Sequence, residues 1–312
     1  MPANSELVSV VIANYNRCKD LREALCSVQQ QNYSAYEIIV VDNASTDDSR
    51  GMLTKEFPAV HLVALAENRG MAGYTVGFEA AQGQFVFQMD NDSLMASGTL
   101  LRETLARFAA RPELDVVATR VEEYRWGDVV EDLRARDPRC GPLYTGGFHS
   151  GGVMFRREVL QNVGGYNRAV FLYGSELFLQ MRILAAGYTI AFYPEILMLH
   201  KSSGVARSSR GLYFELRNRY WFMRCFGTRE QQWRYLPPML IHDMIYAMGR
   251  RKLTALIHAW HDGLGALPPS LIPLHSTNPA FVSKVDEIGS QYNLDSLQRR
   301  VRANFEGRSA RG

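Results

Sequence analysis

Residues 84–92 read QFVFQMDND, an apolar run that ends in two acidic residues spaced two apart, Asp90 and Asp92. The run predicts a buried β-strand, so both carboxylates lie where the chain leaves that strand. Carboxylate oxygens are the ligands that hard cations such as Mg²⁺ and Mn²⁺ prefer, and these cations bridge them to phosphate. Taken alone, the triplet is a weak signal, and an acidic pair that caps a turn is the simpler explanation of it.

Three further apolar segments precede this one, at residues 7–13 (LVSVVIA), 37–41 and 60–65. Helical patterns alternate with them, and a stripe at Leu21, Leu25 and Val28 is typical of an amphipathic helix. Strands that alternate with helices predict an α/β fold with a mostly parallel sheet and helices on both faces. Asp42 and Asp90 each end a strand, and ligands of such sheets bind beyond the carboxyl ends of the strands.

The composition changes near residue 205, where we expect a boundary between an α/β catalytic domain (1–205) and a helical extension (206–312). Between Lys201 and Lys252 there are eleven Lys and Arg against three acids, although the net charge of the whole chain is only +3. This basic stretch indicates an anionic partner, which is a nucleic acid, a membrane surface or a substrate with phosphate groups.

Several classes of protein are disfavoured. No Gly-x-Gly-x-x-Gly follows the first strand, which argues against a dinucleotide-dependent oxidoreductase. The basic half has no recognised nucleic-acid-binding motif, so we expect no nucleic acid partner.

Four scattered cysteines without a Cys-x-x-Cys pair favour a reducing cytoplasm, and the N-terminus does not resemble a signal peptide. No apolar run reaches the length of about 18 residues that a spanning helix needs.

The order of these segments resembles the family 2 glycosyltransferases, which have the GT-A fold, and the resemblance covers residues 7–225. It rests on SVVIANYN (9–16), VVDNASTD (40–47), ENRG (67–70) and the strand that ends in Asp90 and Asp92. The resemblance implies that Asp42 meets the nucleobase, Asp90 the ribose, and Asp92 the diphosphate and a Mg²⁺ or Mn²⁺ ion. The other residues that it assigns to the nucleotide-sugar site are Ala13, Asn14, Tyr15, Asn68, Gly70 and Asn91.

A second group of segments resembles the acceptor side of the same family. Gly151 and Gly152 lie in FHSGGVMF (148–155), and Tyr173 lies in FLYGSE (171–176). Relatives have a Glu-Asp pair in this region, whose second acid is the catalytic base. Ser175 and Glu176 occupy these positions here, so the resemblance makes Glu176 the base, although an acid can equally begin a helix. His200 matches a histidine that completes the metal site in relatives.

The segment Arg217-Asn218-Arg219 resembles bacterial rhamnosyltransferase-like members, and Arg217 either contacts phosphate or lies on a solvated helix face. The implied activity is an inverting transfer from dTDP-rhamnose to a glycan or lipid-linked acceptor in surface polysaccharide synthesis. The alternatives are a UDP-sugar transferase (hexose, HexNAc or galactofuranose) and a non-catalytic relative that binds nucleotide sugars. The apolar stripe at residues 253–264 beside the basic stretch predicts either peripheral membrane contact or internal packing. The sequence predicts no oligomeric state.

Overall fold

The computed structural model describes residues 6–124, 139–144, 146–201 and 208–292 of the chain. It divides into two compact units. The first unit consists of Met1–Arg168 and Ala186–Gly204, and the second of Ala169–Ala185 and Val205–Gly312. The second unit therefore has its main boundary beside the predicted residue 205, but it also takes in a short segment, Ala169–Ala185, that the predicted catalytic domain had included.

The first unit is built on one sheet, and its eight strands in the described residues have the order β3-β2-β1-β4-β7-β6-β8-β5. Their bounds are β1 Val8–Asn14, β2 Tyr36–Asp42, β3 His61–Ala64, β4 Phe85–Asp90, β5 Ser93–Met95, β6 Val116–Tyr124, β7 Val153–Arg156 and β8 Ile190–Lys201. The first four strands are mutually parallel, as predicted. Strand β7 runs antiparallel to β4 and β6, and β5 runs antiparallel to β8, so the sheet is mixed on this side.

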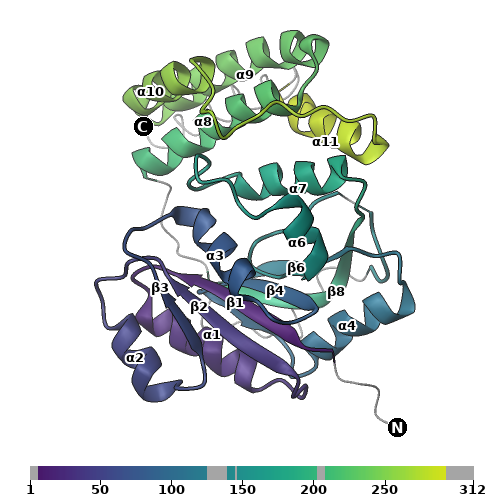
Figure 1. Cartoon of the computed structure of the whole chain (residues 1–312). Helices are drawn as coiled ribbons and strands as arrows, with labels where there is room; N and C mark the ends of the chain where they lie inside the picture. The colour runs from purple at the N-terminus through teal and green to yellow at the C-terminus, as the bar shows by residue number, and fades with distance from the viewer. Residues whose placement is uncertain (1–5, 125–138, 145, 202–207, 293–312) are drawn as a thin grey trace, which may run out of the picture. The chain divides into compact units, whose positions relative to one another are not determined.

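Helices cover both faces of the four parallel strands (Figure 1). The helices of this unit are α1 Cys18–Gln29, α2 Ser49–Glu56, the 3₁₀ turn η1 Gly70–Ala72, α3 Gly73–Ala80, α4 Leu100–Ala110 and α6 Arg157–Val163. Alternate residues of a strand point to opposite faces. Val10 and Ile12 of β1 therefore enter one core cluster together with Leu21 and Leu25 of α1.

The opposite face of β1 and β2 lies under α3. Gly77 of α3 comes so close that a Cβ there would lie 2.4 Å from Val11 Cγ1 and 3.0 Å from Val41 Cγ2. Glycine therefore allows the helix to contact the sheet directly. The parallel pairing of β1 with β2 and β4 places the carboxyl ends of all three strands at one common edge, and the predicted α/β fold with a mostly parallel sheet is confirmed for this half of the unit.

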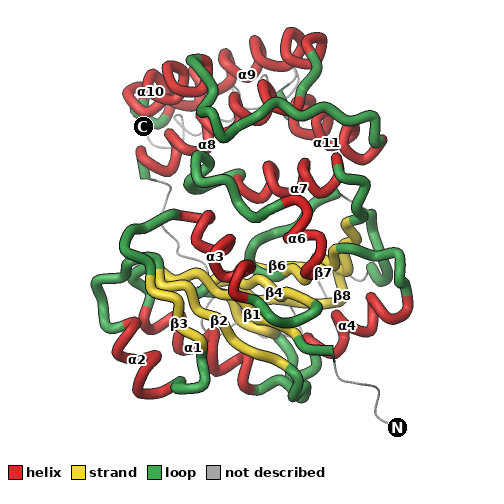
Figure 2. Tube along the Cα trace, in the orientation of Figure 1, coloured by secondary structure: helices red, strands yellow, loops and turns green. Residues whose placement is uncertain are grey.

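The second unit consists of helices and connecting loops in the described residues (Figure 2). Its helices are α7 Ser175–Ala185, α8 Ser209–Phe226, α9 Arg229–Gly249, α10 Leu253–Leu264 and α11 Pro279–Ser290. Polar side chains cap the start of α8, α9 and α11: Ser208 accepts from Gly211 N, Thr228 forms a capping box with Gln231, and Asn278 accepts from Ala280 N. Helix α8 is the core of this unit, and α10 packs along it. Among the described residues, no helix has the length and apolar character needed to cross a membrane.

Candidate active site

The acidic pair and His200 come together because of strand pairing. Asp90 ends β4, Asp92 precedes β5, and β5 pairs with β8 so that Ser93 lies opposite His200. His200 Nε2 is therefore 3.3 Å from Asp92 Oδ1 and 3.9 Å from Asp90 Oδ2. One ligand atom from each of the three residues lies within 4.8 Å of the others. Side chains far apart in the sequence thus form one cluster at the sheet edge.

Two hydroxyl groups orient the Asp90 carboxylate, and neither was predicted from the sequence. The hydroxyl of Tyr74, on α3, donates to Asp90 Oδ1 at 2.9 Å. Ser150 Oγ donates to Asp90 Oδ2 at 3.0 Å. Burial and the negative charge of Asp90 raise the pKa of Tyr74 well above its ordinary value, so this hydroxyl stays a hydrogen-bond donor. Ser150 precedes the predicted Gly-Gly pair and was only an unassigned member of that motif.

Positive side chains border the cluster. Arg17 Nη1 lies 2.7 Å from Asp92 Oδ2 and 3.0 Å from Asp20 Oδ2, and Lys201 Nζ lies 2.9 Å from Asp20 Oδ1. Burial by itself would raise the pKa of Asp92, but the hydrogen bond from His200 and the charges of His200 and Arg17 lower it below its ordinary value. The hydrogen bond with Asp92 raises the pKa of His200, against burial that lowers it. Asp92 is therefore held as a carboxylate.

The donor set fits a divalent cation. Two carboxylates and one imidazole nitrogen are ligands that Mn²⁺ accepts, and the carboxylates suit Mg²⁺ as well. The hydroxyl groups of Tyr74 and Ser150 resemble the outer hydrogen bonds that commonly orient carboxylate ligands of metals. His149, which was assigned no role, also lies here: its ring is 5.7 Å from that of His200, and its Nδ1 accepts from Gly151 N at 2.9 Å.

The ends of β1 and β2 form the neighbouring part of the same edge. Asn14 pairs with Asp42 in the strand register, and Asn14 Oδ1 accepts from Asn91 Nδ2 at 2.8 Å. Asp42 is fully buried, and its Oδ2 accepts from Arg50 Nε at 2.6 Å. No hydrogen bond from the described residues reaches its buried Oδ1. Because a buried acceptor without a partner is costly, a donor from outside the described residues would stabilise this atom.

The other predicted donor-side residues lie around this edge. Ala13 is the β1 residue that lies opposite both Val41 and Asp90, and Tyr15 is exposed just beyond the strand. Asn68 and Gly70 form a turn after β3, in which Gly70 N donates to Asn68 Oδ1 at 2.8 Å. Gly70 has a φ of 58°, a conformation that glycine adopts without steric cost.

The Gly151–Gly152 pair is required by packing. A Cβ on Gly152 would lie 2.4 Å from both Met198 Cγ and Thr119 Oγ1, and a Cβ on Gly151 would lie 2.9 Å from Ser93 Oγ. The chain passes so close to β6 and β8 that no side chain fits at Gly152. The packing explains these glycines without reference to an acceptor, whose contact with them stays a prediction.

Tyr173 and Glu176 belong to the second unit. Tyr173 has a φ of 59°, which is rare for an aromatic residue, and Gly174 follows with a φ of 75°. Asn218 Nδ2 holds this turn by donating to the carbonyls of Leu172 at 2.7 Å and Tyr173 at 2.8 Å. Glu176 then lies in the first turn of α7. A strained turn that neighbouring residues hold in place is common at ligand sites.

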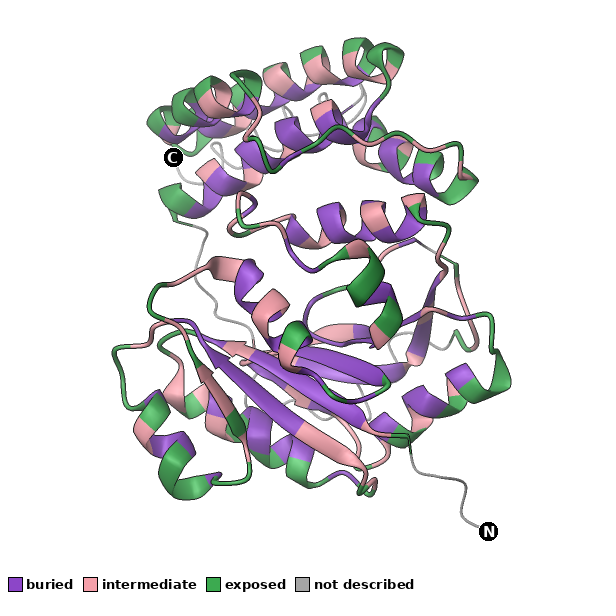
Figure 3. Ribbon diagram, in the orientation of Figure 1, coloured by how far each residue is buried: buried purple, intermediate pink, exposed green. Residues whose placement is uncertain are grey.

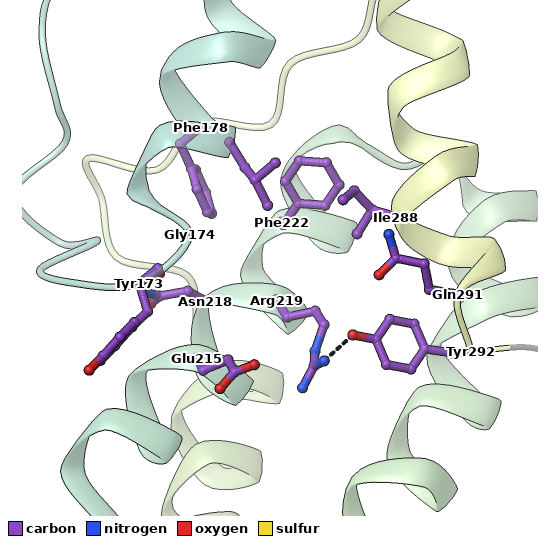
Figure 4. Close-up of a pocket in the computed structure, with 11 residues that line it drawn as sticks. Tyr173, Gly174, Phe178, Glu215, Asn218, Arg219, Phe222, Ile288, Gln291 and Tyr292 are labelled. Atoms are coloured by element: carbon purple, nitrogen blue, oxygen red, sulfur yellow. Dashed lines mark hydrogen bonds between the residues drawn. The ribbon is translucent and has the colours of Figure 1, made fainter. Parts of the chain in front are cut away.

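A pocket opens beside this turn, between α7, α8 and α11 (Figure 4). Its lining contains both aromatic rings and polar side chains. Its lining consists of Tyr173, Gly174, Leu177, Phe178, Glu215, Asn218, Arg219, Phe222, Ile288, Gln291 and Tyr292. Aromatic faces combined with planar polar groups can bind a ligand with apolar faces and hydroxyl edges.

The side chain of Arg217 makes its contacts within the second unit. Its side chain is buried, donates to Ala169 O at 2.9 Å and to Asn218 Oδ1 at 3.1 Å, and stacks 4.0 Å above the Trp221 ring. These contacts tie the segment before Tyr173 to α8. The alternative of a solvated helix face is therefore wrong, and a phosphate would have to compete with these internal partners.

The cluster of two carboxylates and a histidine lies at the strand edge of a mixed α/β sheet with helices on both faces, which is the arrangement expected for the GT-A fold. The model of glycosyl transferase family 2 matches residues 9–164, half of the chain, and the chain belongs to that family of glycosyltransferases.

Individual relatives agree with this family. An uncharacterized glycosyltransferase of a Nostoc species is 30% identical over 169 residues, which are 50% of this chain and 52% of that protein. The O-antigen chain rhamnosyltransferase WbaN of Salmonella anatum is 22% identical over 64% of this chain and 68% of its own length. The match spans about half of the first of these relatives and still less of several others.

Solved structures share the fold. A mannosyltransferase from Pyrobaculum calidifontis, solved in complex with GDP-Man and Mn²⁺, is 19% identical with a TM-score of 0.56, and the likeness covers 95% of this chain and 83% of that one. The TarS fragment 1–349 of S. aureus is 16% identical with a TM-score of 0.58, over 97% of this chain and 91% of that one.

Proposed function

We propose that this protein transfers a sugar from a nucleoside-diphosphate donor to an acceptor hydroxyl, with a divalent metal bound by Asp90, Asp92 and His200. The observation that carries the proposal is the convergence of these three ligand atoms at the carboxyl edge of the sheet. The mannosyltransferase of the same fold was solved with a nucleotide sugar and Mn²⁺, which supports the choice of ligand class.

The residues of the first unit would bind and orient the donor. Asp42 Oδ1 would accept a nucleobase N–H, and Asp90, oriented by Tyr74 and Ser150, would accept a ribose hydroxyl. The metal, when bound, would neutralise charge on the leaving diphosphate. Arg17 and Lys201 would attract the diphosphate to the same side of the cluster.

The second unit would bind the acceptor, a glycan or a lipid-linked saccharide. The aromatic and polar pocket beside Tyr173 suits a sugar ring, because apolar faces of the ring stack on aromatic side chains while hydroxyls bond to polar ones. We assign donor binding to the first unit and acceptor binding to the second, which consists of Ala169–Ala185 and the chain from Val205 onward. Glu176 would accept the proton of the attacking hydroxyl in a single displacement that inverts the anomeric carbon.

A hydrolysis screen without acceptor tests the donor and the metal together. Purified protein is incubated with dTDP-rhamnose and with UDP- and GDP-sugars in Mn²⁺, in Mg²⁺ and in excess EDTA. We expect release of one nucleoside diphosphate that stops in EDTA and returns with added metal. Full activity in EDTA would contradict the metal site. Tight nucleotide-sugar binding without turnover, even with crude acceptor lipids present, would identify a non-catalytic relative.

The donor sugar is the finer part of the proposal. The likeness to the O-antigen chain rhamnosyltransferase supports dTDP-rhamnose and a place in bacterial surface polysaccharide synthesis. A UDP-hexose, UDP-HexNAc or UDP-galactofuranose is the alternative. Preferential hydrolysis of one of these UDP-sugars in the screen would replace dTDP-rhamnose and leave the metal and nucleotide assignments intact.

The base is tested with Glu176→Gln, which keeps the side-chain volume but cannot accept the proton. We expect kcat to fall by about 10²–10⁴-fold with donor affinity near that of the wild type. Glu158→Gln is the matched control, because Glu158 is exposed and is likewise the second residue of its helix, α6. Equal small losses in both variants would mean that Glu176 only stabilises the start of α7.

A further inference from the structure

Large apolar side chains are exposed on two helices of the second unit far more than elsewhere. Of the twelve exposed large hydrophobic residues in the described chain, seven lie on α9 and α10. They include Trp233, with 81% of its surface exposed, and Ile257, with 59%. We call this set the apolar face, and it consists of Trp233, Ile241, Met244, Met248, Leu253, Ile257 and Leu264.

The spacing of these residues places them in one stripe on each helix. At about 100° per residue, the four residues of α9 fall within an arc of about 80° and the three of α10 within about 40°. The residues buried on the same helices, such as Met239 of α9 and Ala255 of α10, point the other way. Both helices pack on α8, and Figure 3 shows their exposed surfaces on the side turned away from it.

Positive charge borders the apolar face at both ends of α9. Arg229 and Arg234 flank Trp233, and Arg250, Arg251 and Lys252 form the corner between the two helices. The acids in the same stretch are Glu230, Asp262 and Asp243, and Asp243 is buried and paired with Arg219. The surface beside the apolar face is therefore net positive.

We propose that the apolar face, together with its arginine border, docks on an anionic lipid surface. Exposed tryptophan, aliphatic and methionine side chains beside Lys and Arg form the combination that inserts at a bilayer interface while the cations contact lipid phosphates. Only part of the predicted stripe at residues 253–264 packs internally, and its exposed members continue a stripe on α9 that the sequence pattern had not indicated.

The positive charge beside the apolar face favours a lipid surface over two other occupants, a second copy of the chain and the chain's own C-terminal end. Symmetric pairing of two copies would set the same basic border against itself, which like charges disfavour. The chain end at residues 293–312 has five arginines and two acids, so it is also not complementary in charge. An anionic bilayer satisfies both the apolar and the basic part of the surface. The inference goes beyond the proposed transfer reaction, and it holds or fails without any donor present.

Vesicle flotation with the full-length protein tests the proposal. The vesicles contain phosphatidylcholine either alone or mixed with phosphatidylglycerol, at low and at high salt. The apolar variant is Met248→Ser/Ile257→Ser, and its control is Ile272→Ser/Val282→Ser, at exposed apolar residues outside α9 and α10. The charge variant is Arg250→Gln/Arg251→Gln, with Lys19→Gln/Lys55→Gln, exposed on α1 and α2, as the control.

We expect the wild type and both controls to float with anionic vesicles at low salt only, and each face variant to partition about tenfold less. Donor hydrolysis without vesicles should be the same in all five proteins, which separates this result from a failure of the proposed function. No flotation of the wild type, or equal flotation of face variants and controls, would overturn the proposal. Self-association that the apolar variant abolishes, without lipid binding, would instead make this face a contact between copies.

Discussion

Two clusters in this protein contain the same three residue types and differ in what they can do. Each joins an aspartate to a histidine and an arginine at hydrogen-bond distance. The first cluster is Asp92 with His200 and Arg17, in the first unit, and the second is Asp243 with His242 and Arg219, in the second unit.

The surroundings of the two carboxylates decide the difference. In the first cluster the side chain of His200 is 29% exposed, and a second carboxylate, Asp90, lies beside it. In the second cluster the side chains of His242 and Asp243 are only 3% and 1% exposed, and the Tyr220 hydroxyl donates to Asp243 Oδ2 at 2.6 Å. In the second cluster the carboxylate is thus buried and paired on both oxygens, whereas the first cluster has a second carboxylate and a partly exposed histidine.

On the proposed function, the same residue types bind a ligand in one unit and hold helices together in the other. A buried ion pair adds little net stability, but removing one partner leaves an uncompensated charge. Burial by itself would lower the pKa of Arg219, whereas the charge of Asp243 raises it above its ordinary value, so the guanidinium stays charged inside the helices. Substitutions at the two aspartates should separate these roles.

The largest effect is expected for Asp243→Asn, which keeps the shape of the side chain and removes its charge. Arg219 would be left buried without a counter-ion, so the unfolding free energy of the second unit should fall by about 3–5 kcal/mol. Urea denaturation followed by tryptophan fluorescence measures it, since Trp221, Trp233 and Trp260 lie in that unit. A midpoint equal to that of the wild type would show that this cluster does not hold the helices together.

The reverse behaviour is expected for Asp92→Asn. Transfer or donor hydrolysis should lose on the order of 10²–10³-fold in kcat/KM, because a charged group at the reacting diphosphate is gone. The unfolding free energy of this variant should fall less than that of Asp243→Asn, because Asp20 and Asp90 remain beside Arg17 and His200 as counter-charges. Steady-state kinetics and the same urea titration measure both. A variant that unfolds early but turns over normally would make the first cluster structural as well.

A smaller effect is expected for Ser150→Ala, which removes one hydroxyl that orients Asp90. Outer partners of metal ligands contribute about 10–100-fold in metal affinity. Titration of free Mn²⁺ by electron paramagnetic resonance should show a loss in that range. Ser290→Ala on α11 is the control, since its hydroxyl donates only to the Glu287 carbonyl at 3.2 Å among the described residues. Unchanged Mn²⁺ affinity would mean that the Tyr74 hydroxyl alone is enough to orient the Asp90 carboxylate.

The acidic residues at the edge of the sheet could be predicted because the sequence pattern that places them there is local. A buried parallel strand is a short apolar run, and the residue after it is necessarily at the carboxyl edge, so Asp42 and Asp90 could be placed from the sequence. Tyr74, Ser150 and Arg17 could not, because they reach the cluster from a helix, a loop and a turn whose packing follows no short-range pattern. His200 was found through the family resemblance, not through periodicity.

In the helical unit the sequence left more open. Arginines and aromatic residues are interleaved along α8, and this pattern suits a phosphate site, a solvated face or an internal stack. Only the packed structure shows that Arg217 stacks on Trp221 and that Arg219 forms an ion pair with Asp243. The stripe at residues 253–264 likewise predicted a single apolar side of one helix. In the structure, Leu256 of that stripe is buried and Ile257 is exposed.

The sequence by itself determined where the parallel strands of the first half lie along the chain, the acidic ends of those strands and the family. Tertiary structure alone decided which charged side chains are satisfied internally and which face outward. The physical reason is that periodicity and strand length act between neighbouring residues, while the burial and pairing of a charge depend on elements that meet from distant parts of the chain.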